Sequence, residues 1–183
     1  MKRLSFLLAL LLALPGLAWA QRVAFDTTMG TIVVELDAKA APKTVANFLE
    51  YVKTGQYNNT IFHRVIGNFM IQGGGYTSDL AEKPTRAPIP LESQSGLKNE
   101  RGTIAMARRA DPNSATSQFF INVVDNPNLD YPKPDGHGYA VFGKVVEGMD
   151  VVDRIRAVQT TSSGPHASLP ATPVVIKSAR IVK

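Results

Sequence analysis

The chain has 183 residues, no cysteine and a formal net charge of +5, with 44% hydrophobic and 19% charged residues. This length fits one domain with an apolar core large enough to need no disulfide bonds. There is no dense run of basic residues, and Arg108-Arg109 is too short to follow a phosphate backbone. Composition and charge therefore argue against a nucleic-acid partner.

The first twenty residues have the three parts of a secretory signal peptide. Lys2 and Arg3 form a basic start, residues 4–14 an apolar segment, and Ala18-Trp19-Ala20 a small-x-small cleavage site. Cleavage after Ala20 would leave residues 21–183 as one domain. Removal of Lys2 and Arg3 lowers the 20 basic residues to 18, against 15 acidic residues, which leaves a net charge of +3.

A membrane anchor is the alternative interpretation of this segment. Pro15 and Gly16 interrupt the apolar run well short of the roughly 20 residues that a membrane-spanning helix needs. We therefore expect no membrane association after cleavage.

The next segments predict a β-hairpin followed by a helix. Residues 23–28 and 31–37 flank Met29-Gly30, which suits a turn. From Pro42 onwards, apolar residues recur at helical spacing, and Gly55 suits the position just past the helix end.

Several short strands are expected after this helix, separated by Gly, Pro, Asn and Asp. They cover residues 60–65, 69–72, 103–107, 118–123 and 140–145. A second helix begins near Gly148, with an apolar stripe of Val151, Val152 and Ile155, and residues 174–182 form a closing strand. Residues 84–90, 127–134 and 165–173 contain prolines and are predicted to be surface loops. Many short strands of this kind indicate a sandwich or a closed barrel.

Residues 62–74 (FHRVIGNFMIQGG) combine apolar residues with a few polar side chains. If they form two strands, we expect Arg64 to face away from Phe62, His63 and Val65, and Met70 and Gln72 to share one face while Phe69 and Ile71 share the other. An ordinary half-buried hairpin explains the stretch equally well when it is considered alone. An arginine and a glutamine beside an apolar wall favour a binding site.

Three further blocks follow in order: residues 102–108 (GTIAMAR), 117–122 (SQFFIN) and 141–145 (VFGKV). Together with residues 62–74, they resemble the cyclophilin family of peptidyl-prolyl cis/trans isomerases over nearly the whole chain after residue 20. The resemblance implies a mainly β fold, a closed eight-stranded antiparallel barrel capped by two α-helices. It also implies a monomer without a cofactor that binds proline-containing segments of folding proteins. With the signal peptide, it favours the periplasm, where the chain would assist the folding of exported proteins.

Isomerisation of an X-Pro bond is a kinetic problem, because the barrier is roughly 18–20 kcal/mol while the trans preference is only about 0.5–1 kcal/mol. No covalent bond breaks, so no nucleophile is required. In the twisted amide the nitrogen loses conjugation and gains a lone pair that accepts a hydrogen bond. Arg64 is the predicted catalytic donor to that nitrogen.

The resemblance also implies the substrate-binding residues. The apolar proline pocket is expected to contain Phe69, Met70, Phe120 and Leu129. The peptide channel is expected to contain Gln72, Ala107, Arg108 and Gln118. Arg108 stands where many members carry asparagine; a contact made by its backbone would preserve function, and the added charge would bias substrate choice. Tyr139 stands where many members carry histidine, and His137 is a competitor for the same role.

Other activities find less support. The three histidines His63, His137 and His166 lack the spacing of metal ligands, so no metal site is predicted. Residues 73–75 are consecutive glycines, but no Lys-Ser/Thr pair follows them, and close backbone packing explains them better than a phosphate loop. The serious alternative is a non-catalytic module that binds proline-containing segments as a chaperone.

Overall fold

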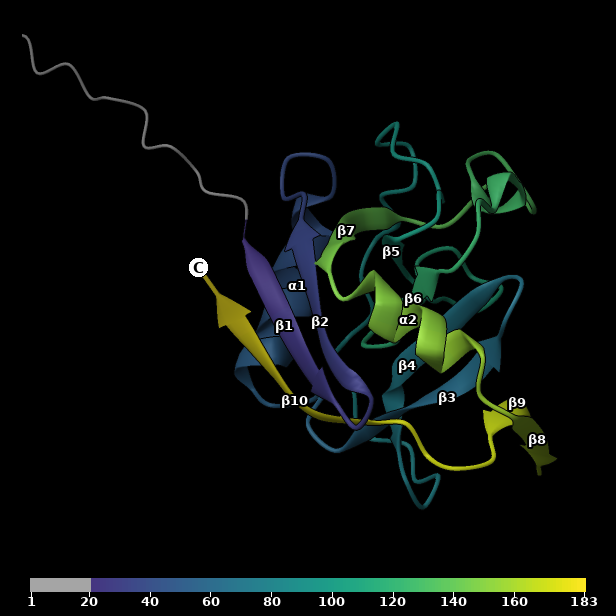
Figure 1. Cartoon of the computed structure of the whole chain (residues 1–183). Helices are drawn as coiled ribbons and strands as arrows, with labels where there is room; N and C mark the ends of the chain where they lie inside the picture. The colour runs from purple at the N-terminus through teal and green to yellow at the C-terminus, as the bar shows by residue number, and fades with distance from the viewer. Residues whose placement is uncertain (1–20) are drawn as a thin grey trace, which may run out of the picture.

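The computed structural model describes residues 21–183, and the predicted signal peptide lies outside them. Eight antiparallel strands form a closed barrel with the neighbour order β1-β10-β3-β4-β6-β5-β7-β2 (Figure 1). The barrel strands are β1 (Arg22–Thr27), β2 (Gly30–Leu36), β3 (Thr60–Ile66), β4 (Met70–Thr77), β5 (Thr103–Met106), β6 (Phe119–Asn122), β7 (Val141–Glu147) and β10 (Val175–Val182). The predicted mainly β barrel is confirmed.

The first hairpin and the first helix form where the sequence places them. Thr27 pairs with Gly30 across the β1–β2 turn, and Gly30 has a φ of 127°, which suits glycine. Helix α1 (Pro42–Lys53) begins with its proline in the first turn. Gly55 follows the helix in a left-handed conformation, so its prediction as the residue past the helix end is confirmed.

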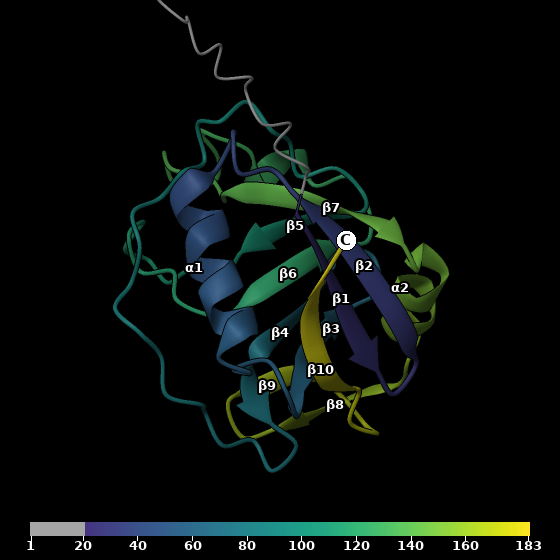
Figure 2. The same cartoon turned by 90° about the vertical axis from the view of Figure 1, so that its left-hand side faces the viewer.

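The two helices lie on opposite sides of the barrel (Figure 2). Phe48 of α1 and Val152 of α2 (Met149–Arg156) both belong to the large buried cluster that fills the barrel. The helices therefore complete the core, as the predicted caps require. Within residues 21–183, no helix is both long enough and apolar enough to cross a membrane.

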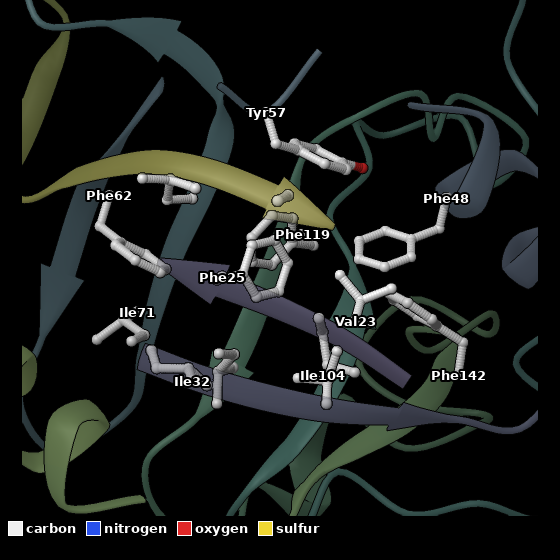
Figure 3. Packing of buried hydrophobic residues seen from close by; sticks show 14 of the residues in the cluster. Val23, Phe25, Ile32, Phe48, Tyr57, Phe62, Ile71, Ile104, Phe119 and Phe142 are labelled. Carbon is white, nitrogen blue, oxygen red and sulfur yellow. The ribbon is translucent and has the colours of Figure 1, made fainter. Parts of the chain in front are cut away.

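Side-chain alternation on four neighbouring strands separates two apolar clusters. The large cluster includes Phe25, Phe48, Tyr57, Phe62 and Phe119, and its aromatic rings pack together in the barrel interior (Figure 3). Along each of these strands, the neighbours of the core residues point to the opposite face and form a second apolar cluster there. Its strand residues are Met70 on β4, Phe120 on β6, Ala105 on β5 and Val141 on β7. Period-two geometry thus gives one set of strands two apolar faces.

A β-bulge changes the alternation in β3. Phe62 pairs with Gly73 and Arg64 pairs with Gln72, so His63 is an extra residue on β3. Phe62 and Val65 lie in the core, and Arg64 is turned away from them. For Phe62 this outcome requires the bulge, because unbroken alternation would place residues 62 and 64 on the same face. The expectation that His63 shares their face is wrong, because its ring packs against Tyr76 and His166.

Phe69 also departs from the predicted alternation. It precedes β4, in the turn after β3, and packs with the second cluster, whereas Ile71 lies in the core. Met70 and Gln72 do share a face, since both line the same cavity.

Two other elements differ from the sequence prediction. Residues 165–173 were expected to form a loop, but β8 (Thr160–Ser163) and β9 (His166–Pro170) form a small two-stranded sheet beside β3. Strand β8 is polar and all four of its residues are exposed, so it has no hydrophobic alternation to detect. Strand β4 continues through the three glycines to Thr77. Glycine suits these three positions because the neighbouring backbone, aromatic rings and Gln118 side chain leave little room for a side chain there.

Candidate active site

The second apolar cluster forms the floor of a surface cavity of about 290 Å³. The cavity is lined by residues from β3, β4, β6 and the segments around β5 and β7. These residues are Arg64, Phe69, Met70, Gln72, Ala107, Arg108, Phe120, Leu129 and Tyr139. The structure therefore brings together every predicted site residue except Gln118.

The floor of the cavity is apolar and well packed. Met70, Phe120 and Leu129 are buried, and Phe69 and Tyr139 complete the wall. The Tyr139 ring meets Phe120 edge to face, with the ring centroids 5.7 Å apart. A compact apolar ring fits such a surface better than a charged or extended group does.

Arg64 supplies a charged donor at the edge of this floor. Its guanidinium carbon lies 5.9 Å from the centroid of the Phe69 ring. In the described part of the chain, none of the salt bridges involves Arg64. Its guanidinium is thus available to a bound molecule.

Arg108 differs, although it lines the same cavity. Its side chain is only 2% exposed and pairs with Asp135 at 2.7 Å. It also donates to the carbonyl oxygens of Gly138 and Arg109. The hydrogen bond from Arg108 holds the pKa of Asp135 below its ordinary value. The charge of Arg108 is therefore satisfied within the protein, which leaves its backbone to face the channel.

Gln118 lies beside the cavity and connects it to a second one. Its side-chain oxygen accepts a hydrogen bond from the Gln72 amide nitrogen at 2.9 Å, and its carbonyl oxygen accepts one from Ala107 N–H at 3.0 Å. It lines an adjoining cavity of about 470 Å³, to which Gln72, Ala107 and Arg108 also contribute. The two cavities are therefore adjacent, one with an apolar floor and the other with a more polar lining.

A buried amide network supports the floor, and the sequence analysis did not identify it. Asn126 donates to the Phe69 carbonyl oxygen at 2.8 Å and to the Asn122 side chain at 2.7 Å. Asn122 in turn donates to Asn99 and Thr103. The network joins Phe69 to the short helix η1 (Pro127–Leu129), which carries Leu129. These asparagines are separated in sequence, so no local pattern points to them.

The remaining candidates fall outside the cavity. His137 is exposed and lines a different depression, where its carbonyl oxygen accepts a hydrogen bond from Ser93. Among residues 21–183, no group of three or more His, Cys, Asp or Glu side chains is arranged to hold a metal ion. The packing explanation for residues 73–75 is confirmed at Gly73, where a side-chain carbon would lie 3.1 Å from the Ile61 carbonyl oxygen.

Comparison with known proteins agrees with this fold. The family model described as cyclophilin type peptidyl-prolyl cis-trans isomerase/CLD matches residues 22–181. Peptidyl-prolyl cis-trans isomerase cyp18 of Streptomyces antibioticus is 57% identical over 162 residues, covering 87% of this chain and 98% of its own length. A peptidyl-prolyl cis-trans isomerase of Acinetobacter baylyi is 51% identical over 181 residues, covering 99% of this chain and 96% of its own length.

A solved structure gives the same result at lower identity. The cyclophilin type peptidyl-prolyl cis-trans isomerase of Cryptosporidium parvum, crystallised in the presence of the dipeptide Ala-Pro, superposes with a TM-score of 0.74 at 29% identity, covering 89% of this chain and 99% of that chain. The fold is thus common to both proteins. The chain belongs to the cyclophilin-type peptidyl-prolyl cis/trans isomerase family, and its activity is the isomerisation of X-Pro bonds.

Proposed function

We propose that Arg64 is the catalytic residue of this isomerase and that the apolar cavity binds the proline ring of the substrate. The substrate-binding residues of this proposal are Phe69, Met70, Gln72, Ala107, Arg108, Gln118, Phe120, Leu129 and Tyr139. The proposal rests chiefly on the contrast between two arginines at one cavity. Arg108 is satisfied by the protein, whereas Arg64 makes no salt bridge within residues 21–183 and stands beside the apolar floor.

Arg64 lowers the barrier by donating to the imide nitrogen when the amide is twisted. In the planar ground state that lone pair is conjugated and accepts poorly, so the interaction strengthens in the transition state. A hydrogen bond from a charged donor contributes about 1.5–3 kcal/mol. The apolar floor supports this interaction because it excludes water from the rotating bond.

Two glutamines hold the peptide on one side of the rotating bond. The hydrogen bond between Gln72 and Gln118 orients both amides, and each retains polar atoms for the substrate backbone. The extended backbone at Ala107 and Arg108 lies beside them and can pair with the substrate as an added strand does. When the peptide on one side of the X-Pro bond is held in place, the motion of the proline side is confined to rotation about that bond.

Proline-containing segments of folding proteins are the proposed substrates. Crystallisation of the Cryptosporidium parvum isomerase in the presence of the dipeptide Ala-Pro supports this choice of ligand class. The sequence of residues 1–20 supports exported clients and a periplasmic location, where the chain would act as a monomer free of the membrane.

The experiment that tests the catalytic role compares Arg64→Ala with the unmodified residues 21–183. We expect the variant to accelerate cis/trans exchange of an Ala-Pro peptide about tenfold to a hundredfold less, since it lacks the charged donor. Peptide binding, followed by titration, should stay close to that of the unmodified protein. Arg64→Lys is the matched control, because it keeps the charge without the planar donor group and should retain part of the rate.

A non-catalytic binding module, the alternative weighed from the sequence, would bind the Ala-Pro peptide without accelerating its exchange, so the unmodified protein in the same experiment distinguishes it from the isomerase. The Arg64→Ala variant addresses a narrower point. Full exchange activity in this variant, with binding retained, would contradict the proposed role of Arg64. Loss of both binding and activity would indicate that Arg64 supports the cavity rather than the reaction.

A further inference from the structure

The guanidinium of Arg108 is enclosed to a degree that is unusual for this surface. Its side chain is 2% exposed, whereas Arg101, which forms a similar pair with Asp153, is 40% exposed. All three nitrogen atoms of Arg108 donate: Nε and Nη2 to the Gly138 carbonyl oxygen at 3.0 and 2.9 Å, and Nη1 to the Arg109 carbonyl oxygen at 3.0 Å. This arginine is therefore locked by contacts on every edge.

Asp135 completes these contacts from the loop before β7. Both of its carboxylate oxygens accept from Nη2 of Arg108, at 2.8 and 2.7 Å. Gly138, three residues later, has a φ of 68°, and a side-chain carbon there would lie 2.5 Å from the Tyr131 backbone nitrogen. The Gly138 carbonyl that Arg108 binds is thus held in a conformation that other residues do not fit.

The same guanidinium lies over the Tyr139 ring. The guanidinium carbon lies 4.5 Å from the centroid of the Tyr139 ring. This ring also meets Phe120 at the cavity floor, and the Tyr139 backbone N–H donates to the Leu129 carbonyl oxygen at 2.9 Å. Tyr139 is consequently enclosed between Arg108 and the floor of the cavity.

We propose that Arg108 and Asp135 are positioning residues for the isomerase reaction, because together they fix the Tyr139 ring as one wall of the proline cavity. The inference rests on the proposed function of that cavity. Neither residue donates to the substrate through its side chain. Their effect is preorganisation: the ring stands in place before the substrate binds, so binding does not require it to be ordered.

The test uses Asp135→Asn and Arg108→Lys in residues 21–183, with Asp153→Asn as the matched control. Asp153 is also paired with an arginine, and its side-chain exposure of 37% is close to the 39% of Asp135. Exchange of an Ala-Pro peptide gives KM and kcat, and the NMR signals of the Tyr139 ring, assigned with Tyr139→Phe, report its environment.

We expect both test variants to raise KM about threefold to tenfold, the scale of a partly desolvated cation–π contact, because a ring that is held less firmly must be ordered on binding, while kcat changes less. The Tyr139 signals should shift in both test variants and stay unchanged in Asp153→Asn. If Arg108→Lys does not fold, Asp135→Asn is sufficient for the test, because it changes an exposed side chain and is expected to fold.

Two results would overturn the inference. Unchanged KM together with unchanged Tyr139 signals would show that the ring does not depend on Arg108 and Asp135. Shifted signals with unchanged KM would reduce the contacts to a structural role. Failure of the proposed function looks different: Arg64→Ala would then keep full activity, whereas the Tyr139 signals would still respond to Asp135→Asn.

Discussion

One extra residue in β3 decides which side chains reach the active site. Without the bulge, strict alternation would place Phe62 and Arg64 on the same face. The bulge at His63 lets Phe62 enter the core and Arg64 reach the cavity two positions later. The bulge also places the His63 ring against Tyr76 of β4 and His166 of β9.

His63 is buried, and burial favours its neutral form. It is 5% exposed, its Nδ1 atom has no hydrogen-bond partner in the described structure, and its ring contacts Tyr76 and His166. Burial lowers the pKa of His63 to about 4, and the charges of His166 and Arg64 act in the same direction.

Protonation of His63 should therefore destabilise the protein in mildly acidic solution. Below the ordinary pKa of 6.5 the unfolded chain binds a proton that the folded chain does not bind until about pH 4. Stability is thus complete above pH 6.5 and is lost as the pH falls, by roughly 2–3 kcal/mol near pH 4. Urea unfolding at pH 7 and pH 4.5 measures this change.

The control for this prediction is His63→Gln, which has no proton to gain. Its free energy of unfolding should decrease less between pH 7 and pH 4.5 than that of the unmodified protein. Equal decreases in the two proteins would show that other groups cause the acid sensitivity.

Strand β4 serves the core and the active site at once. Ile71 faces the barrel interior, while Met70 and Gln72 face the cavity. The glycines that follow allow close approach of two different kinds of neighbour. A side-chain carbon at Gly74 would lie 2.9 Å from the Tyr57 ring, whereas the nearest atoms to one at Gly75 all belong to the Gln118 side chain.

Alanine substitutions at these two glycines should therefore have different effects. Gly74→Ala forces a left-handed residue, with a φ of 86°, against aromatic rings in the core, and we expect a loss of about 1–3 kcal/mol in the free energy of unfolding. Gly75→Ala displaces a flexible side chain and breaks the hydrogen bond between Gln72 and Gln118. It should lower exchange activity about threefold to tenfold with little change in stability.

Urea unfolding and Ala-Pro exchange, measured on both variants, check this pair of predictions. Each variant controls for the other, because both add one methyl group to the same strand. Equal losses of stability would contradict the separation of the two faces of β4.

The whole barrel is required to assemble the site, because its residues extend from Arg64 to Tyr139 along the chain. Strands β4, β6, β5 and β7 are neighbours only in the closed barrel, and η1 and the loop before β7 fold over them. The site residues named above all lie between Arg64 and Tyr139, and the proposed role of residues 1–20 is delivery of the chain to its compartment.

Export of the chain is the prediction for the whole molecule. Expressed in a Gram-negative host, the full chain should appear in the periplasmic fraction with Gln21 as its first residue, as the cleavage pattern requires. Mass spectrometry of the fractionated protein measures this. A version lacking residues 2–20 is the control and should remain in the cytoplasm. Uncleaved full-length chain in the cytoplasm would contradict the proposed location.

Most of the fold could be predicted from short-range patterns in the sequence. Hydrophobic alternation indicated the barrel strands, and proline, glycine and apolar spacing indicated both helices, since these signals act within a few residues. Strands β8 and β9 were missed because β8 lacks buried residues. The bulge at His63 was missed because pairing with β4, rather than the sequence of β3, determines it.

The sequence by itself determined the family, the barrel class and the identity of the residues that line the cavity. Only the tertiary structure decided what each of them can do. It left Arg64 available while Asp135 and Gly138 satisfied Arg108, and it placed Tyr139 rather than His137 in the cavity wall. The physical reason is that an arginine can bind a substrate only if its charge is not already paired, and its partners come from distant segments that barrel closure brings together. A local sequence pattern does not identify those partners.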